Sequence, residues 1–119
     1  MIIEKLIKNA DKKIGNSEFN EAIDIYDLII RKNPYHEVAN FNSGSIYLDL
    51  GQSEKAIHCF NRVIAIDSGS AEAHNNLGIA YHELGRLAEA ESSLRVALDI
   101  DPRCTQAYIN LGRTLEASG

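Results

Sequence analysis

The feature that most constrains the fold is an internal repeat of 34 residues. Three full units and a shorter fourth one align without a gap: 3–36, 37–70, 71–104 and 105–119. A repeat of this length holds two short helices and the turn between them, and such units stack only on their neighbours. We therefore expect a single domain across residues 1–119, built by adding similar layers along one axis.

Small and large side chains recur at fixed places of the unit, as close helix packing requires. Glycine stands at the eighth place (Gly44, Gly78, Gly112), and alanine stands at the twentieth (Ala22, Ala56, Ala90). A small residue lets one helix approach its partner closely, which offsets the cost of about 1 kcal/mol for glycine inside a helix. Larger side chains at the eleventh and twenty-fourth places then fill the remaining space.

The third unit carries the fullest pattern, L-G-x2-Y, then A-x3-[bulky]-x2-A and a closing proline, in residues 77–102. This pattern resembles the tetratricopeptide repeat family. The segment His74-Asn75-Asn76-Leu77-Gly78 is similar to the repeats of the O-linked N-acetylglucosamine transferase type, and the similarity is confined to the repeats. The resemblance implies an all-α, right-handed α-solenoid of antiparallel helix pairs, with a concave groove lined by the first helix of each pair.

Turn residues divide this solenoid into seven helices. Gly51 and Gly85 follow the apolar pattern of a first helix, where glycine commonly ends a helix. The corner between units falls near Asn33-Pro34 and Asp101-Pro102, because proline lacks an N–H donor and restricts the residue before it. The predicted helices are 3–14, 18–32, 36–50, 53–66, 70–84, 87–100 and 104–117.

Three asparagines stand in register on the face that the resemblance assigns to the groove: the sixth place holds Lys8, Asn42, Asn76 and Asn110. Asparagine is a weak helix former, and helix packing does not require it there. Its carboxamide has donors and an acceptor that suit the backbone of an extended peptide. We hypothesise a ladder that holds a peptide backbone. The alternative is that the asparagines recur by duplication and stay solvated, or bond to the backbone of neighbouring helices.

Other partner-binding candidates on the same face are Ser45, Ile79, His82 and Arg113. The expected groove carries more acidic than basic residues, with Glu4, Asp11, Asp49, Glu72, Glu83 and Glu116 against Lys8 and Arg113. Such a groove favours a neutral or basic segment of a partner protein. The alternative is that these charges only keep the chain in solution.

A second binding mode of the family captures a C-terminal carboxylate with lysine, arginine and asparagine on successive first helices. The corresponding places hold Ile7, Asp11, Glu72 and Asn76 in one frame, and Phe41, Ser45, Gln106 and Asn110 in the next. The basic residues are missing. We therefore expect that the chain does not recruit the C-terminal tails of heat-shock chaperones.

Other function classes find little support. The net charge is −5 and the 12 Lys and Arg residues are scattered, which argues against nucleic acid. No apolar run approaches the ~18 residues of a membrane span, so we expect no membrane partner and a cytoplasmic location. His82 has no metal-ligating partner one helical turn away, and no catalytic group assembles. We expect no metal, no cofactor and no enzymatic activity, with Cys59 and Cys104 as free thiols.

The fourth unit contains only a first helix, which carries Ile109, Leu111 and Leu115. This helix either caps the stack, or associates with a second copy, or continues into a longer protein. Two functions follow as hypotheses: an adaptor that binds a peptide in the groove, and a module that forms homo-oligomers through its terminal helices.

Overall fold

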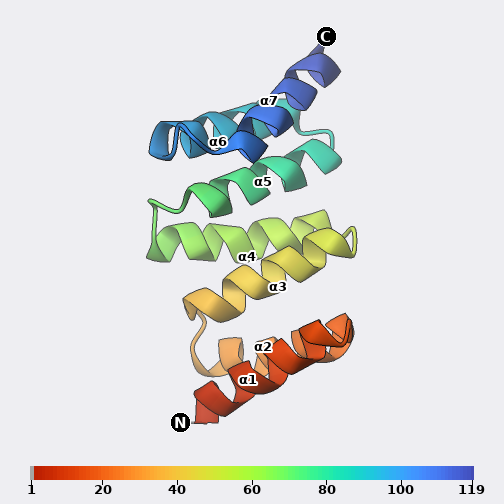
Figure 1. The fold of residues 1–119 in the computed structure, drawn as a ribbon, viewed down its shortest axis with the longest axis vertical. Coiled ribbons are helices and arrows are strands. Elements are labelled where there is room, and N and C mark those ends of the chain that lie inside the picture. Colours follow the sequence, from red (N-terminus) through yellow and green to blue (C-terminus); the bar gives the residue numbers. More distant parts are fainter. Residues whose placement is uncertain (1) are drawn as a thin grey trace.

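The computed structural model describes residues 2–119, which form seven α-helices joined by short turns and no strand (Figure 1). The helices are α1 (Ile2–Gly15), α2 (Phe19–Lys32), α3 (Glu37–Asp49), α4 (Ser53–Ile66), α5 (Ala71–Glu83), α6 (Leu87–Ile100) and α7 (Thr105–Ser118). Every observed helix end lies within one residue of the predicted end. The all-α prediction is therefore confirmed.

The helices stack in chain order along one axis, from α1 at the N-terminal end to α7 at the C-terminal end (Figure 1). The stack measures 47 × 25 × 22 Å. Beyond its chain neighbours, α5 also contacts α3 and α7, so these first helices of successive units lie side by side. None of the helices in residues 2–119 is long and apolar enough to cross a membrane.

Each full unit ends its first helix with the same turn. The residue after the helix cap takes a left-handed conformation, with φ +76° at Gly51 and at Gly85, as predicted for glycine. In the first unit this place holds Ser17, with φ 61°. The Glu18 N–H donates to the Lys13 carbonyl at 2.7 Å, which closes that turn in the same way. Ser17 thus adopts a conformation that glycine tolerates better.

The glycines at the eighth place differ in their surroundings. A Cβ atom on Gly44 would lie 2.8 Å from Cζ of Phe60, and one on Gly78 would lie 2.5 Å from Cγ of Leu94. A Cβ on Gly112 would meet no atom of residues 2–119 within 4 Å. The prediction of close approach is confirmed for Gly44 and Gly78. It is wrong for Gly112, because none of the helices in the described part of the chain covers this face of α7.

The core of the described residues forms three clusters along the stack, and the first of them extends from the first unit to Ala39 and Ile46 of α3. One cluster surrounds Tyr26 in the first unit and a second surrounds Phe60, and Tyr47 packs against both. At the seventh place the third unit buries Leu77, whereas the second unit has Ser43. Ser43 is 1% exposed, and its hydroxyl has no hydrogen-bond partner within residues 2–119. This serine therefore leaves the core incompletely filled between α2 and α4.

Candidate functional site

Two of the three predicted asparagines use their amide donors inside the stack. Nδ2 of Asn42 donates to the Tyr26 hydroxyl at 2.9 Å, and Nδ2 of Asn110 donates to Oδ1 of Asn75 at 3.0 Å. Both partners are side chains of the preceding unit, and not the helix backbone considered above. Asn76 makes no hydrogen bond from its side chain to another described residue, and it lies half-buried on α5. Asn76 is thus the one of the three carboxamides that makes no side-chain hydrogen bond within residues 2–119.

A hollow lies between α3 and α5, and we call it the α3–α5 hollow. Its volume is about 350 Å³, and it is lined by Ser45, Leu48, Asp49, Asn76, Ile79 and Glu83. Leu48 and Ile79 supply apolar surface, while Asp49 and Glu83 supply carboxylates from two different helices. Oε2 of Glu83 accepts a hydrogen bond from Ser53 Oγ at 2.7 Å, which fixes this carboxylate at the start of α4. No basic residue lines the hollow, so its chemistry suits a cationic side chain.

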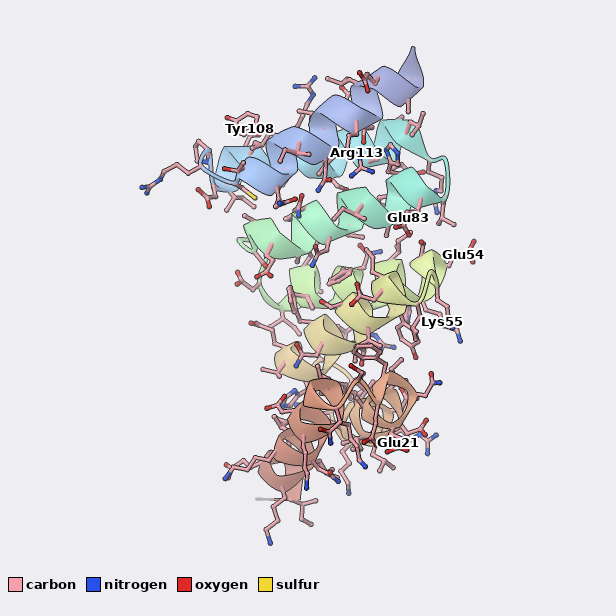
Figure 2. All side chains as sticks on the ribbon, turned by 45° about the vertical axis from the view of Figure 1, so that its right-hand side comes forward. Glu21, Glu54, Lys55, Glu83, Tyr108 and Arg113 are labelled. Carbon is pink, nitrogen blue, oxygen red and sulfur yellow. The ribbon has the colours of Figure 1, made fainter. Side chains whose placement is uncertain are left out.

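A second hollow, the α5–α7 hollow, adjoins the first and shares Ile79 and Glu83 with it. It is smaller, about 100 Å³, and is lined by Gly78, Ile79, His82, Glu83, Asn110, Arg113 and Thr114. Nδ1 of His82 lies 2.9 Å from Oγ1 of Thr114, so the imidazole ties α5 to α7. Figure 2 shows Arg113 on α7 above Glu83 on α5. Arg113 is exposed and forms no ion pair within residues 2–119, so it provides a positive charge beside the acidic hollow.

The structure thus brings most of the predicted site residues together. Ser45, Asn76 and Ile79 line the α3–α5 hollow, and His82, Asn110 and Arg113 line the α5–α7 hollow. Lys8 and Asn42 line neither: Lys8 is exposed on α1 and Asn42 bonds to Tyr26. Sequence analysis did not name Leu48 and Thr114 as site residues. Leu48 stands at the same place of its unit as the predicted site residue His82. This shared place could have identified Leu48 as a site residue.

Two family models match the chain: TPR repeat over residues 44–85, and Tetratricopeptide repeat over residues 71–104. Residues 44–104 match tetratricopeptide repeats, and the fold of residues 2–119 is of the same type. Among solved structures, the first TPR of Spaghetti (RPAP3) bound to the HSP90 peptide SRMEEVD is similar, with a TM-score of 0.91 and 25% identity. That match covers 98% of this chain and 92% of the other. MamA from Desulfovibrio magneticus RS-1 has a TM-score of 0.93 at 22% identity, over 98% of this chain and 66% of that chain, and shows the fold alone.

A curated relative adds sequence similarity over part of these repeats. It is the tetratricopeptide repeat and J domain-containing co-chaperone DNJ1 of Fusarium oxysporum f. sp. lycopersici. The two are 31% identical over 72 residues, which is 60% of this chain and 14% of the co-chaperone. The matched region therefore spans about one seventh of that relative's length.

A third hollow is lined by residues of α2, α3 and α4, and it shares no lining residue with the other two. This α2–α4 hollow has a volume of about 320 Å³. It is lined by Asp27, Ile30, Ser43, Tyr47, Glu54, Lys55, His58, Cys59 and Arg62. Loss of hydration raises the pKa of Asp27, and burial raises the pKa of the Cys59 thiol to about 11. None of the predicted site residues lines this hollow. The prediction was confined to the face that the family resemblance assigns to the groove.

Proposed function

We propose that these repeats form a protein-interaction module that holds an extended segment of a partner protein across α3, α5 and α7. The observation that carries this proposal is the pair of adjoining hollows on that face, which share Ile79 and Glu83. Extended peptides place successive side chains on alternate sides, so neighbouring hollows suit side chains two positions apart. The available carboxamide of Asn76 lies in the first hollow, where it supports contact with the peptide backbone.

The charges favour a partner segment with a lysine or arginine side chain. Its aliphatic stem would lie along Leu48 and Ile79, and its cationic head would lie near Asp49 and Glu83. A carboxylate in the same hollow would meet two like charges without a basic residue to compensate. The acidic character expected for the whole groove therefore applies only to the α3–α5 hollow, because Arg113 lines the α5–α7 hollow.

The similar RPAP3 domain is bound to the peptide SRMEEVD, which contains three acidic residues and ends in a carboxylate. In this chain the places that would hold basic residues for such an end are occupied by Ile7, Glu72 and Asn76. We therefore expect SRMEEVD to bind this chain more weakly than a peptide selected for a basic residue. The proposed partner is a basic extended segment.

Selection from a displayed library of random peptides tests this proposal. We expect enrichment of peptides with lysine or arginine. An enriched peptide, labelled for fluorescence anisotropy, should lose at least about tenfold in affinity with Asp49→Lys, because a favourable close charge becomes a repulsive one. Asp99→Lys on α6 is the matched control: it makes the same charge change at an exposed residue of a second helix, outside both hollows. Equal affinities of the two variants would contradict the proposal.

Self-association through α7 is a second candidate function. Tyr108, Ile109 and Leu115 are 53%, 49% and 42% exposed, and Figure 2 places Tyr108 on the last helix of the stack. Exposed apolar side chains gathered on one helix are typical of interaction surfaces. Sedimentation equilibrium over a wide range of concentrations distinguishes the two candidates. A mass that stays at 13.2 kDa would rule out the second one.

A further inference from the structure

The α2–α4 hollow has a specific cause in the sequence. At the seventh place of the third unit Leu77 is 4% exposed and belongs to the core cluster around Phe60. The second unit has Ser43 at that place, and its smaller side chain leaves part of the corresponding volume unfilled. A cavity of about 320 Å³ lies at the lower end of the range for small-molecule pockets, roughly 300–1,000 Å³.

The deep part of this hollow combines apolar walls with one polar group. Ile30 and Tyr47 provide the apolar surface, and Cys59 adds to it because its thiol stays protonated at neutral pH. Oγ of Ser43 is buried without a hydrogen-bond partner among residues 2–119. A buried hydroxyl without a partner is unfavourable, and a ligand that hydrogen-bonds to it removes that cost.

The outer part of the hollow carries basic groups on α4. Lys55, His58 and Arg62 follow one another at intervals of three and four residues, so they share one face of the helix. None of them lies within 4 Å of a carboxylate in the described part of the chain. A further hollow of about 270 Å³ shares His58 and Arg62, so this pair stands between two depressions of the surface.

Two acidic groups also line the α2–α4 hollow. Asp27 lies on α2, where loss of hydration raises its pKa, and the neighbouring charges of Arg31 and Lys55 lower it. Glu54 lies in the first turn of α4, close enough to Arg86 to raise the pKa of that guanidinium. Arg62 therefore supplies a positive charge on the α4 side of the hollow, with no carboxylate of residues 2–119 within 4 Å.

We propose that the α2–α4 hollow binds a small aromatic acid whose ring carries a hydroxyl group. The ring would pack against Ile30 and Tyr47, and the ring hydroxyl would bond to Oγ of Ser43. The carboxylate would lie toward Arg62 at the outer end. This hollow shares no lining residue with the α3–α5 hollow or the α5–α7 hollow, so ligand binding here can be tested separately from peptide binding.

Titration of the ¹⁵N-labelled chain with 4-hydroxyphenylacetate, followed by NMR, tests this proposal. We expect shifts of the backbone amides of Ser43, Tyr47 and Cys59. Phenylacetate lacks the ring hydroxyl and should bind about 3- to 10-fold more weakly. Tyramine keeps the hydroxyl and has a protonated aminomethyl group in place of the carboxylate, so it should bind more weakly than 4-hydroxyphenylacetate.

Two variants locate the binding site. Ser43→Leu fills the hollow as Leu77 does in the next unit, and it should abolish the shifts while circular dichroism confirms an unchanged fold. Ser43→Ala keeps the space and removes the hydroxyl, so 4-hydroxyphenylacetate and phenylacetate should then bind equally. Shifts confined to other residues, equal binding of all three compounds by the unmodified chain, or binding that survives Ser43→Leu would each overturn the proposal.

Discussion

Replacing the glycine at the eighth place of the repeat by alanine tests how closely the helices pack at that place. The same substitution can be made in three units, at Gly44, Gly78 and Gly112. In Gly78→Ala the new Cβ would lie 2.5 Å from Cγ and 2.6 Å from Cδ2 of Leu94, which is fully buried. Rotation about χ2 of Leu94 leaves Cγ in place, and a change of χ1 would move this fully buried side chain into its neighbours. Overpacking costs up to about 3 kcal/mol, and the better helix propensity of alanine returns about 1 kcal/mol. We expect a net loss of about 2 kcal/mol in the free energy of unfolding.

Gly112→Ala should have the opposite effect. No atom of the described chain lies within 4 Å of the new Cβ, so only the propensity gain of about 0.5–1 kcal/mol remains. Gly44→Ala should fall between the two, because its Cβ would meet Cζ of Phe60 at 2.8 Å, the far end of a ring. The extreme variants should therefore differ by about 2.5–3 kcal/mol, or roughly 10–12 °C in Tm for a chain of this size.

Thermal and urea unfolding, followed by circular dichroism at low protein concentration, measures this series. The expected order of stability is Gly112→Ala, then the unmodified chain, then Gly44→Ala and last Gly78→Ala. If Gly112→Ala were as destabilising as Gly78→Ala, the open face of α7 would have to be covered in solution, and the packing argument for Gly112 would be refuted. A loss that grows with protein concentration would identify the cover as a second copy of the chain.

Three further predictions concern single side chains. Ser17→Gly should stabilise the chain by about 0.5–1 kcal/mol in the same unfolding assay, because serine is strained at φ 61°, and no gain would show that the strain is absent. Cys59 should resist iodoacetamide at pH 8 while Cys104 reacts, because burial raises the pKa of the Cys59 thiol to about 11. The raised pKa also makes stability depend on pH. The contribution of the protonated thiol is complete below the pKa of the unfolded chain and is lost as pH rises through the pKa of the folded chain. Tyr26→Phe should cost about 0.5–1.5 kcal/mol by removing the acceptor for Asn42, and unchanged NMR signals of the Asn42 side-chain amide would contradict that bond.

Local signals explain why the helices could be predicted to within one residue. Gly51 and Gly85 are the residues that a left-handed turn favours, and apolar positions recur with helical spacing before each of them. Ser17 stands at the same place of its unit without such a preference. Its turn could be inferred only from the repeat, since the repeat aligns Ser17 with the two glycines.

The site was harder to predict because its contacts join residues of different units. Asn42 bonds to a hydroxyl 16 residues earlier, and Asn110 bonds to an amide 35 residues earlier. A repeat alignment shows which residues share a place, but it does not show which side chains of the preceding unit reach them. The α2–α4 hollow was hard to predict for a related reason: it results from the smaller side chain of Ser43, and a sequence motif does not show where a side chain is too small to fill the core. The departure from leucine at the seventh place was the one sign of it in the sequence.

The preceding unit explains why Asn76 differs from the other two asparagines. Asn42 meets Tyr26, which stands at the twenty-fourth place, and the same place one unit before Asn76 holds Phe60, which has no hydroxyl. Asn110 meets Asn75 at the fifth place, and the same place one unit before Asn76 holds Phe41. These two phenylalanines pack edge to face, with ring centroids 5.6 Å apart, and offer no acceptor. Aromatic residues at both places therefore leave the Asn76 carboxamide without a side-chain partner among residues 2–119, in the hollow that also holds Asp49 and Glu83.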